Sequence, residues 1–254
     1  MPPKKKEITL DDIASMIGGL QSEIKEINKK LDSVVSSNKK LEDSVNILTE
    51  QLKMQILISN KHEQHNRVEC LRITNLPLDP DQASDNVYVK QAVYDGVLKP
   101  ILQAACDDPR DNLKQLPSKN ELVKNAHILP KPRNKQNDPN PIIVRLNQID
   151  VRSRIFKYRG KYTSPISGVR PMVKEDLTKL NITTLSRLHS DEKIDTAWSM
   201  QGNLFYTLKS ESSSKKHRVT DPFDWLTKDD LSSLGICLPE SSVDDQHSNQ
   251  DESV

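Results

Sequence analysis

The sequence predicts an α+β protein in which a long N-terminal coiled coil is followed by two small α/β domains. Three observations support this fold class. Apolar residues recur in heptads through residues 10–52, and short β-branched runs alternate with helical periodicity after residue 66. Only 34% of the 254 residues are hydrophobic, while 29% are charged. This composition is lean for one compact globule and is typical of a chain that combines an extended part with small folded cores.

Residues 9–66 are predicted to form the coiled coil. Steps of three and four residues from Leu10 reach thirteen a and d positions, of which twelve are apolar and one, Asn38, is polar. Sustained heptads of this kind specify a left-handed coiled coil. The alternative is one amphipathic helix of a bundle, for which the sequence offers no partner of similar length. The predicted oligomerisation positions are Leu10, Ile13, Ile17, Leu20, Ile24, Ile27, Leu31, Val34, Asn38, Leu41, Val45, Leu48 and Leu52.

The oligomeric state follows less directly from the heptads. Isoleucine and leucine are mixed at both a and d, which favours a homotrimer over a dimer, and Asn38 at an a position is compatible with either. After Leu52 the seam becomes polar, so the helix is expected to continue without a strong oligomerising face.

Residues 67–174 are predicted to form the first α/β domain. Strands are expected at residues 67–76, 121–129, 142–146 and 169–173, and helices at residues 86–105 and 150–160. Pro100 is expected to kink the first of these helices rather than prevent it. The resulting β-α-β-β-α-β order is the ferredoxin-like arrangement that RNA-recognition-motif domains use.

Residues 175–238 are predicted to form the second, smaller α/β domain. We expect a helix that begins at Asp176 or Thr178, a hairpin that turns at Gln201-Gly202-Asn203, and a short strand near Arg218. A further short helix is expected at residues 221–234. The two ends of the chain are predicted to be a basic tail, 1–8, and an acidic disordered tail, 239–254.

The formal net charge of +1 hides a strong partition. Residues 130–161 hold nine Lys/Arg against two acids, a net charge of +7, whereas residues 219–254 hold one lysine against nine acids, a net charge of −8. Such asymmetry indicates a centre that faces a polyanion and an acidic tail. The candidate phosphate contacts are Lys131, Arg133, Lys135, Arg145, Arg152, Arg154, Lys157, Arg159 and Lys161, with a second cluster at Lys215, Lys216 and Arg218.

The strands of the first α/β domain indicate how such a centre would bind. RNA-recognition motifs stack bases on aromatic residues of the first and third strands, but here those strands read CLRIT and IIVRL and offer Arg72 and Arg145 instead. Backbone contact by cations is therefore expected, with weak sequence preference and strong salt dependence. Tyr162, Tyr206 or Phe205 offers a ring for stacking on bases, although Phe205 is expected to be a core residue and Trp198 a packing residue of the hairpin.

Other readings of the basic residues stay open. The cations of the second predicted helix are the solvated face of a soluble protein in the simplest alternative, which the scarcity of acids disfavours. The Lys215–Arg218 cluster either extends the binding track or is a loop that resembles a nuclear-localisation signal.

Several classes of protein are not expected. The cysteines at 70, 106 and 237 have no metal-ligand spacing, so we expect no metal site, no cofactor and no disulfide framework. No paired carboxylates with a nucleophile and no phosphate-cradling glycine loop occur, so an enzyme is not expected. The N-terminus lacks an apolar signal core and no run approaches membrane-spanning length, which favours an intracellular, reducing compartment and no membrane partner.

Four blocks in order carry a family resemblance: the heptads, HNRVECLRITNLP, HILPKPRNKQNDPNPIIVRL, and VKEDLTKLN with DTAWSMQGNLFY. Together, over about residues 10–235, they resemble the first open-reading-frame protein of LINE-type non-LTR retrotransposons. The related baculovirus few-polyhedra protein shares the segments in weaker form.

The resemblance implies a trimeric coiled coil, a noncanonical RNA-recognition-motif domain and a small C-terminal α/β domain. It also implies binding of single-stranded RNA or DNA in a cleft that a basic loop and a basic helix line against the C-terminal domain. The expected role is that of a nucleic-acid chaperone in a cytoplasmic ribonucleoprotein, and the sequence leaves open whether the chain also enters the nucleus. The competing hypothesis is a coiled-coil adaptor that does not bind nucleic acid.

Overall fold

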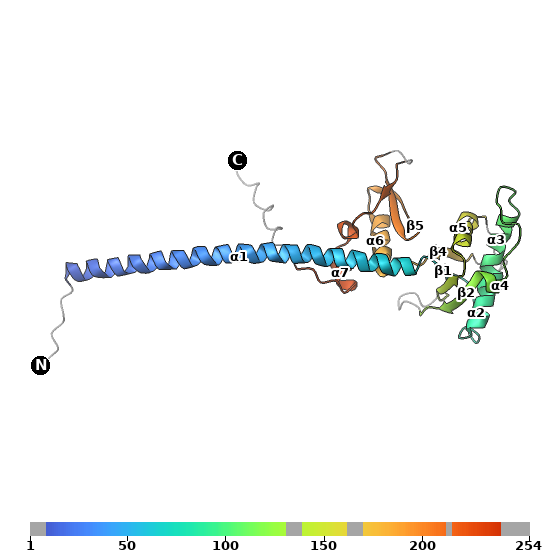
Figure 1. Ribbon diagram of the computed structural model, residues 1–254, viewed down its shortest axis with the longest axis horizontal. Helices are drawn as coiled ribbons and strands as arrows, with labels where there is room; N and C mark the ends of the chain where they lie inside the picture. Colours follow the sequence, from blue (N-terminus) through green and yellow to red (C-terminus); the bar gives the residue numbers. More distant parts are fainter. Residues whose placement is uncertain (1–8, 131–138, 162–169, 212–214, 240–254) are drawn as a thin grey trace. The chain divides into compact units, whose positions relative to one another are not determined.

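A computed structural model describes residues 9–130, 139–161, 170–211 and 215–239. It consists of a long N-terminal helix, an antiparallel four-stranded sheet with its helices, and a small C-terminal sheet (Figure 1). The coarse α+β architecture that the sequence predicts is therefore confirmed. By their contacts, residues 58–236 form one compact unit, and the helix up to residue 57 belongs to another. The tail 1–8 and most of the predicted tail 239–254 lie outside the described residues.

Helix α1 (Leu10–Asn66) contains all the predicted heptads. Its twelve apolar a and d residues are exposed, each with between 42% and 85% of its surface accessible. A single helix with such a stripe has nothing to bury it, and helical stability in proteins comes mostly from packing of the apolar face. The helix is thus consistent with the predicted coiled coil. It continues past Leu52 to Asn66, about 21 Å at 1.5 Å per residue, with polar residues at the a and d positions Gln55, Ser59, His62 and Asn66.

The larger sheet follows the predicted order of elements. Strands β1 (Cys70–Thr74), β2 (Val123–Ile128), β3 (Ile142–Leu146) and β4 (Met172–Glu175) pair antiparallel in the order β2-β3-β1-β4. Between β1 and β2 run α2 (Asn86–Val93), a π-helical turn (Tyr94–Leu98), α3 (Lys99–Cys106) and the single turn α4 (Lys119–Leu122). Helix α5 (Ile149–Tyr158) connects β3 to β4.

Several boundaries differ from the sequence-based ones. The second strand begins at Val123, because Glu121 and Leu122 belong to the helical turn α4. The fourth strand lies at residues 172–175 rather than 169–173, because Glu175 still pairs with Leu71 and Met172 pairs with Thr74. The helix continues through Pro100, as expected, and its irregularity is the π turn just before the proline, closed by a hydrogen bond from the Lys99 N–H to the Tyr94 carbonyl. The expected kink at Pro100 itself stays a prediction.

The sheet separates a core face from an open face. On the core face, Leu71 and Ile73 of β1 and Val144 of β3 are fully buried against the helices, which contribute Ile101 and Ile155 among others. Because strand side chains alternate, the intervening residues of β1, β3 and β4 lie on the opposite face. These are Cys70, Arg72, Thr74, Ile143, Arg145, Met172 and Lys174.

The C-terminal part contains α6 (Lys179–Ser190) and a sheet of β5 (Ile194–Met200), β6 (Asn203–Leu208) and β7 (His217–Arg218). The Thr178 side chain caps α6 by accepting the Asn181 N–H, one of the two starts that the sequence allowed. The hairpin turns through Gln201 and Gly202, whose φ angles of 53° and 77° suit a tight two-residue turn. A second small core is built on Leu177, Leu188, Ile194 and Leu204.

The predicted single helix at 221–234 is wrong. The segment forms a 3₁₀ turn (Pro222–Trp225) and a separate helix α7 (Lys228–Ser233). Thr227 and Asp230 form a capping box that begins α7 afresh, and the extended Leu226 interrupts the first turn.

Candidate nucleic-acid interface

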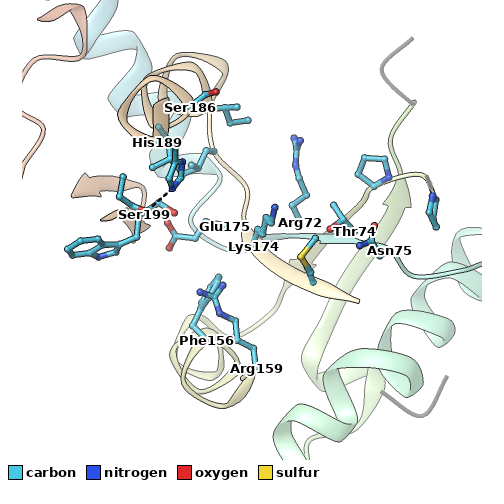
Figure 2. A pocket seen from close by; sticks show the side chains of 18 residues that line it. Arg72, Thr74, Asn75, Phe156, Arg159, Lys174, Glu175, Ser186, His189 and Ser199 are labelled. Carbon is cyan, nitrogen blue, oxygen red and sulfur yellow. Dashed lines mark hydrogen bonds between the residues drawn. The ribbon is translucent and has the colours of Figure 1, made fainter. Parts of the chain in front are cut away.

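A cavity of about 790 Å³ opens beside the larger sheet, within the compact unit 58–236. Figure 2 shows its labelled side chains in three groups: Arg72, Thr74 and Lys174 on the strands β1 and β4, Phe156 and Arg159 on α5, and Ser186, His189 and Ser199 on α6 and β5. Apolar residues complete the wall, among them Met172, Leu177, Ile182 and Leu185. Asn75 and the carboxylate of Glu175 line it as well, so the cavity combines cations and an acid with apolar surface.

Strand pairing places two of the cations side by side. Arg72 of β1 and Lys174 of β4 are register partners and project from the open face of the sheet. The Arg72 Nη2 lies 3.3 Å from an oxygen of the buried Asp176, whose other oxygen lies 3.1 Å from Arg67. Lys174 is exposed and makes no ion pair with any residue in the described part of the chain. Lys174 is thus the cation of the cavity most available to an anionic ligand.

Helix α5 contributes a third cation through Arg159. Its Nη1 donates to the Val173 carbonyl at 2.7 Å, and its guanidinium lies 4.8 Å from the centre of the Phe156 ring. Burial lowers the pKa of the Arg159 guanidinium, and the nearby Glu175 carboxylate opposes this shift. The group stays charged at neutral pH, because an arginine pKa begins above 12. It is a pre-positioned cation with an aromatic face beside it.

Arg152 is not placed as a surface phosphate contact, unlike the prediction. Its side chain is 7% exposed and forms an ion pair with Glu175, which is 5% exposed. Its guanidinium also lies 4.9 Å from the Phe156 ring centre. The residue lies in the first turn of α5 and its charge is neutralised by Glu175 of β4, so this charge is used inside the fold. We therefore leave Arg152 out of the candidate interface.

The outer cations of α5 meet acids from the loop that follows α3. Arg154 and Lys157 lie 3.0 Å and 3.2 Å from the oxygens of Asp111. Lys161 lies 3.6 Å from Asp108, which also accepts a hydrogen bond from Tyr158 and pairs with Arg110. Hydrogen bonds from Arg110 hold the pKa of Asp108 well below its usual range. These cations are expected to be partly neutralised, which the sequence did not indicate.

The remaining predicted contacts are dispersed. Arg145 lies on the open sheet face, 3.0 Å from Glu69. In the C-terminal part, Lys215 pairs with Glu211 at 2.8 Å and Arg218 donates to Asn203 at 2.6 Å. Lys131, Arg133 and Lys135, like Tyr162, lie outside the described residues. Of the predicted contacts that the structure describes, only Arg159 lines the cavity.

Sequence reasoning missed two features of this region. The first is Lys174, which strand alternation through MVKE would have placed on the open face with Arg72. The second is a pair of rings: Trp198 and Phe205 are cross-strand partners, stacked with their centres 5.9 Å apart. The expectation that Phe205 is a core residue is wrong, because its neighbours Leu204 and Tyr206 face the small core and Phe205 faces away. Lys216 lies 6.0 Å from the Trp198 ring centre.

The described residues contain no group of three or more His, Cys, Asp or Glu side chains that could hold a metal ion. None of their helices is long and apolar enough to cross a membrane. Comparison with models of known protein families finds no match, and comparison with curated proteins finds none either.

Proposed function

We propose that this chain is an oligomeric single-stranded nucleic-acid-binding protein that acts as a chaperone in a ribonucleoprotein of the retrotransposon type. The observation that carries the proposal is the cavity in which Arg72, Lys174 and Arg159 meet apolar walls. Single-stranded nucleic acid needs both features, since its phosphates bind cations and its bases stack on rings or apolar surface. The sheet order and the four sequence blocks support a noncanonical RNA-recognition-motif domain.

In this proposal the phosphates lie along the open face of the sheet, beside Lys174 and Arg159. Phe156 and the stacked Trp198–Phe205 pair offer surfaces for bases, and Trp198 also lines the cavity. None of these contacts reads a base edge, so sequence preference is weak. Because β1 and β3 lack aromatic residues, the mode differs from base stacking on the sheet.

Chaperone activity follows from the number of weak sites. If the heptads of α1 assemble a homotrimer, three sites are linked, and the second and third binding events occur at a high effective concentration. Each site releases its strand quickly while the oligomer stays bound, which lets paired strands rearrange. The proposed location is a cytoplasmic ribonucleoprotein with a nuclear phase.

The test is fluorescence anisotropy of a labelled single-stranded RNA with the full chain, over a series of salt concentrations. Lys174→Gln is compared with Lys157→Gln, a matched control that removes a lysine held by Asp111 outside the cavity. We expect Lys174→Gln to weaken binding and to reduce the slope of log K against log salt by about 0.7 for the lost phosphate contact. Lys157→Gln is expected to leave both quantities close to those of the unchanged chain.

Two results would contradict the proposal. Equal losses for both lysines would move the interface from the cavity to the outer face of α5. No binding by the unchanged oligomer at low salt would remove nucleic-acid binding altogether. In that case one observation favours the coiled-coil adaptor. The cations on the outer side of α5 already form ion pairs with Asp108 and Asp111.

A further inference from the structure

The last turns of α1 contact the C-terminal part of the same chain through polar side chains. Gln64 is 7% exposed, although it lies on a helix whose earlier residues are almost all exposed. Its Nε2 donates to the Asp176 carbonyl at 3.0 Å. Its Oε1 accepts the Thr178 N–H at 2.9 Å and the Asn181 Nδ2 at 3.0 Å. Both polar atoms of this buried amide are therefore satisfied.

Asn60 and Arg67 reinforce the contact on either side of Gln64. Asn60 donates to the Asn181 Oδ1 at 3.0 Å and accepts from the Thr178 hydroxyl at 2.6 Å. Arg67 pairs with Asp176 at 3.1 Å. The bonds converge on the segment 176–181, which includes Leu177 of the cavity wall and the first turn of α6. The last turns of α1 thus bind within the chain through residues at b and f positions, which lie outside the a and d seam.

The hairpin turn packs so closely against Gln64 that a side chain at Gly202 would clash with it. Gly202 has a φ of +77°, and a Cβ built there would lie 2.5 Å from the Gln64 Cγ. Gln64 has little freedom to move aside because its amide is held by three hydrogen bonds. From the other side, Glu175 accepts the N–H groups of Gln201 and Gly202 at 2.7 Å and 3.2 Å. The turn is therefore held between a residue of α1 and a residue of β4.

This arrangement bears on the cavity without forming part of its wall. Asn60, Gln64 and Gly202 do not line the cavity. Leu177, Ala197 and Ser199 do: Leu177 belongs to the segment 176–181 that α1 binds, and the other two belong to β5, which the turn at Gly202 follows. A buried polar network that is fully satisfied in one geometry specifies that geometry, since other arrangements leave polar atoms unpaired. The contact can thus fix where the α6–β5 wall stands relative to Arg72 and Lys174.

We propose that Gln64 and Gly202 are positioning residues: the end of the heptad helix locks the α6–β5 wall of the cavity in place. This inference rests on the proposed function for its consequence, because a misplaced wall weakens nucleic-acid binding only if the cavity binds nucleic acid. The lock itself is a property of the fold and can be measured without a ligand.

The test uses a double-mutant cycle in the full chain. Gly202→Ala introduces the clash with Gln64. Gln64→Ala removes the three hydrogen bonds of the lock, and the double variant shows whether the two substitutions act through the same contact. Gly235→Ala is the matched control, because Gly235 has a φ of +72° and nothing within 4 Å of an added Cβ. The first readout is amide hydrogen exchange of β5 and α6, and the second is affinity for single-stranded RNA with its salt slope.

We expect Gly202→Ala to speed exchange in β5 and α6 but not in β1–β4, and to weaken RNA binding by about three- to thirtyfold, as for other couplings of this kind. The salt slope should not change, because the cations of the cavity remain. Gln64→Ala should have the same two effects, and the double variant should be little worse than Gln64→Ala alone, because the clash at Gly202 requires the Gln64 side chain. Gly235→Ala should alter neither readout.

The outcomes separate the two proposals. Unchanged exchange in Gln64→Ala, or fully additive effects in the double variant, overturns the lock whatever the RNA data show. Faster exchange in both single variants without additivity in the double variant supports the lock even if the unchanged chain binds no RNA, a result that overturns the proposed function alone. A loss of the salt slope along with the affinity would also count against positioning, because it would mean that the cations had been displaced.

Discussion

Single side chains decide which charges reach the cavity and which are used inside the fold. Glu175 is the clearest case, since its carboxylate pairs with Arg152 and accepts the N–H groups of Gln201 and Gly202. One residue at the end of β4 therefore connects α5 with the C-terminal hairpin. The sequence shows that α5 is rich in cations. Whether Arg152 is buried depends on Glu175, an acid 23 residues further along the chain.

Replacing Arg152 tests this reading by its effect on stability. Arg152→Ala leaves the Glu175 carboxylate buried with only its two backbone donors, so we expect the free energy of unfolding to fall by about 3 kcal/mol, the lower end for a broken buried pair. Arg145→Ala is the control, since Arg145 and Glu69 are each 43% exposed and such pairs contribute about 1 kcal/mol or less. Urea denaturation at one fixed chain concentration measures both.

Equal effects of these two arginine substitutions would contradict the buried-pair assignment. A loss of RNA affinity in Arg152→Ala without any loss of stability would do so too, because it would return Arg152 to the set of phosphate contacts.

At the scale of the elements, local sequence patterns predicted much of the secondary structure. They predicted little of the pairing between residues that lie far apart in the sequence. β3 lies at residues 142–146, where the sequence predicted a strand, and the predicted helix at 150–160 buries Val151, Ile155 and Tyr158, whose spacing of four and three residues places them on one face. The spacing also shows that α5 has cationic faces. It has no means of showing that Asp108 and Asp111, from a loop about forty residues earlier, bind one of those faces.

The candidate site was predicted only in part for the same physical reason. The sequence identified a basic helix and a cleft against the C-terminal domain, the latter through a family resemblance. The cavity itself depends on which side of α5 approaches α6 and β5, and this follows from contacts such as Glu175 with Gln201. Arg159 is on that side, whereas Arg154 and Lys157 are not. Strand alternation could have placed Lys174 on the open face of the sheet. The sequence identified Gly202 only as a turn residue.

The contact between α5 and the loop after α3 predicts a pH dependence. Burial tends to raise the pKa of Asp111, but hydrogen bonds from Arg154 and Lys157 outweigh it and lower this pKa to about 2. The unfolded chain titrates near the usual value of about 3.9. The folded state therefore favours the ionised carboxylate, and the stability that it contributes is fully present above about pH 5 and is lost as the pH falls towards 2.

Asp111→Asn should remove this contribution. We expect the variant to be less stable than the unchanged chain at neutral pH, and the gap in urea midpoint to narrow steadily between about pH 5 and pH 2. A gap of constant size across this range would contradict the assignment, since it would mean that the charge of Asp111 does not stabilise the fold.

At the scale of the whole molecule, α1 presents different surfaces along its length. Up to Leu52 its apolar a and d residues are exposed, while from Asn60 polar residues at b and f positions bind within the compact unit 58–236. In the proposed oligomer the first part of the helix joins the copies, and its last turns dock within the chain. The two functions can be separated by substitutions on the first part of the helix.

Ile27→Glu with Val34→Glu places two charges at d positions, and Ser22→Glu with Ser36→Glu places the same charges at outward f positions. We expect the first variant to sediment as single chains with reduced helicity, because an isolated helix is marginal in water, while the unit 58–236 still unfolds cooperatively. Its affinity for a short RNA that fills one site should be unchanged. Its affinity for a long single strand should fall by about a hundredfold or more, because only the linked sites supply avidity. The f-position variant should behave as the unchanged chain.

Equal losses on short and long RNA would mean that the heptads contribute to the site itself, and an oligomer that survives both glutamates would mean that another surface holds the copies together.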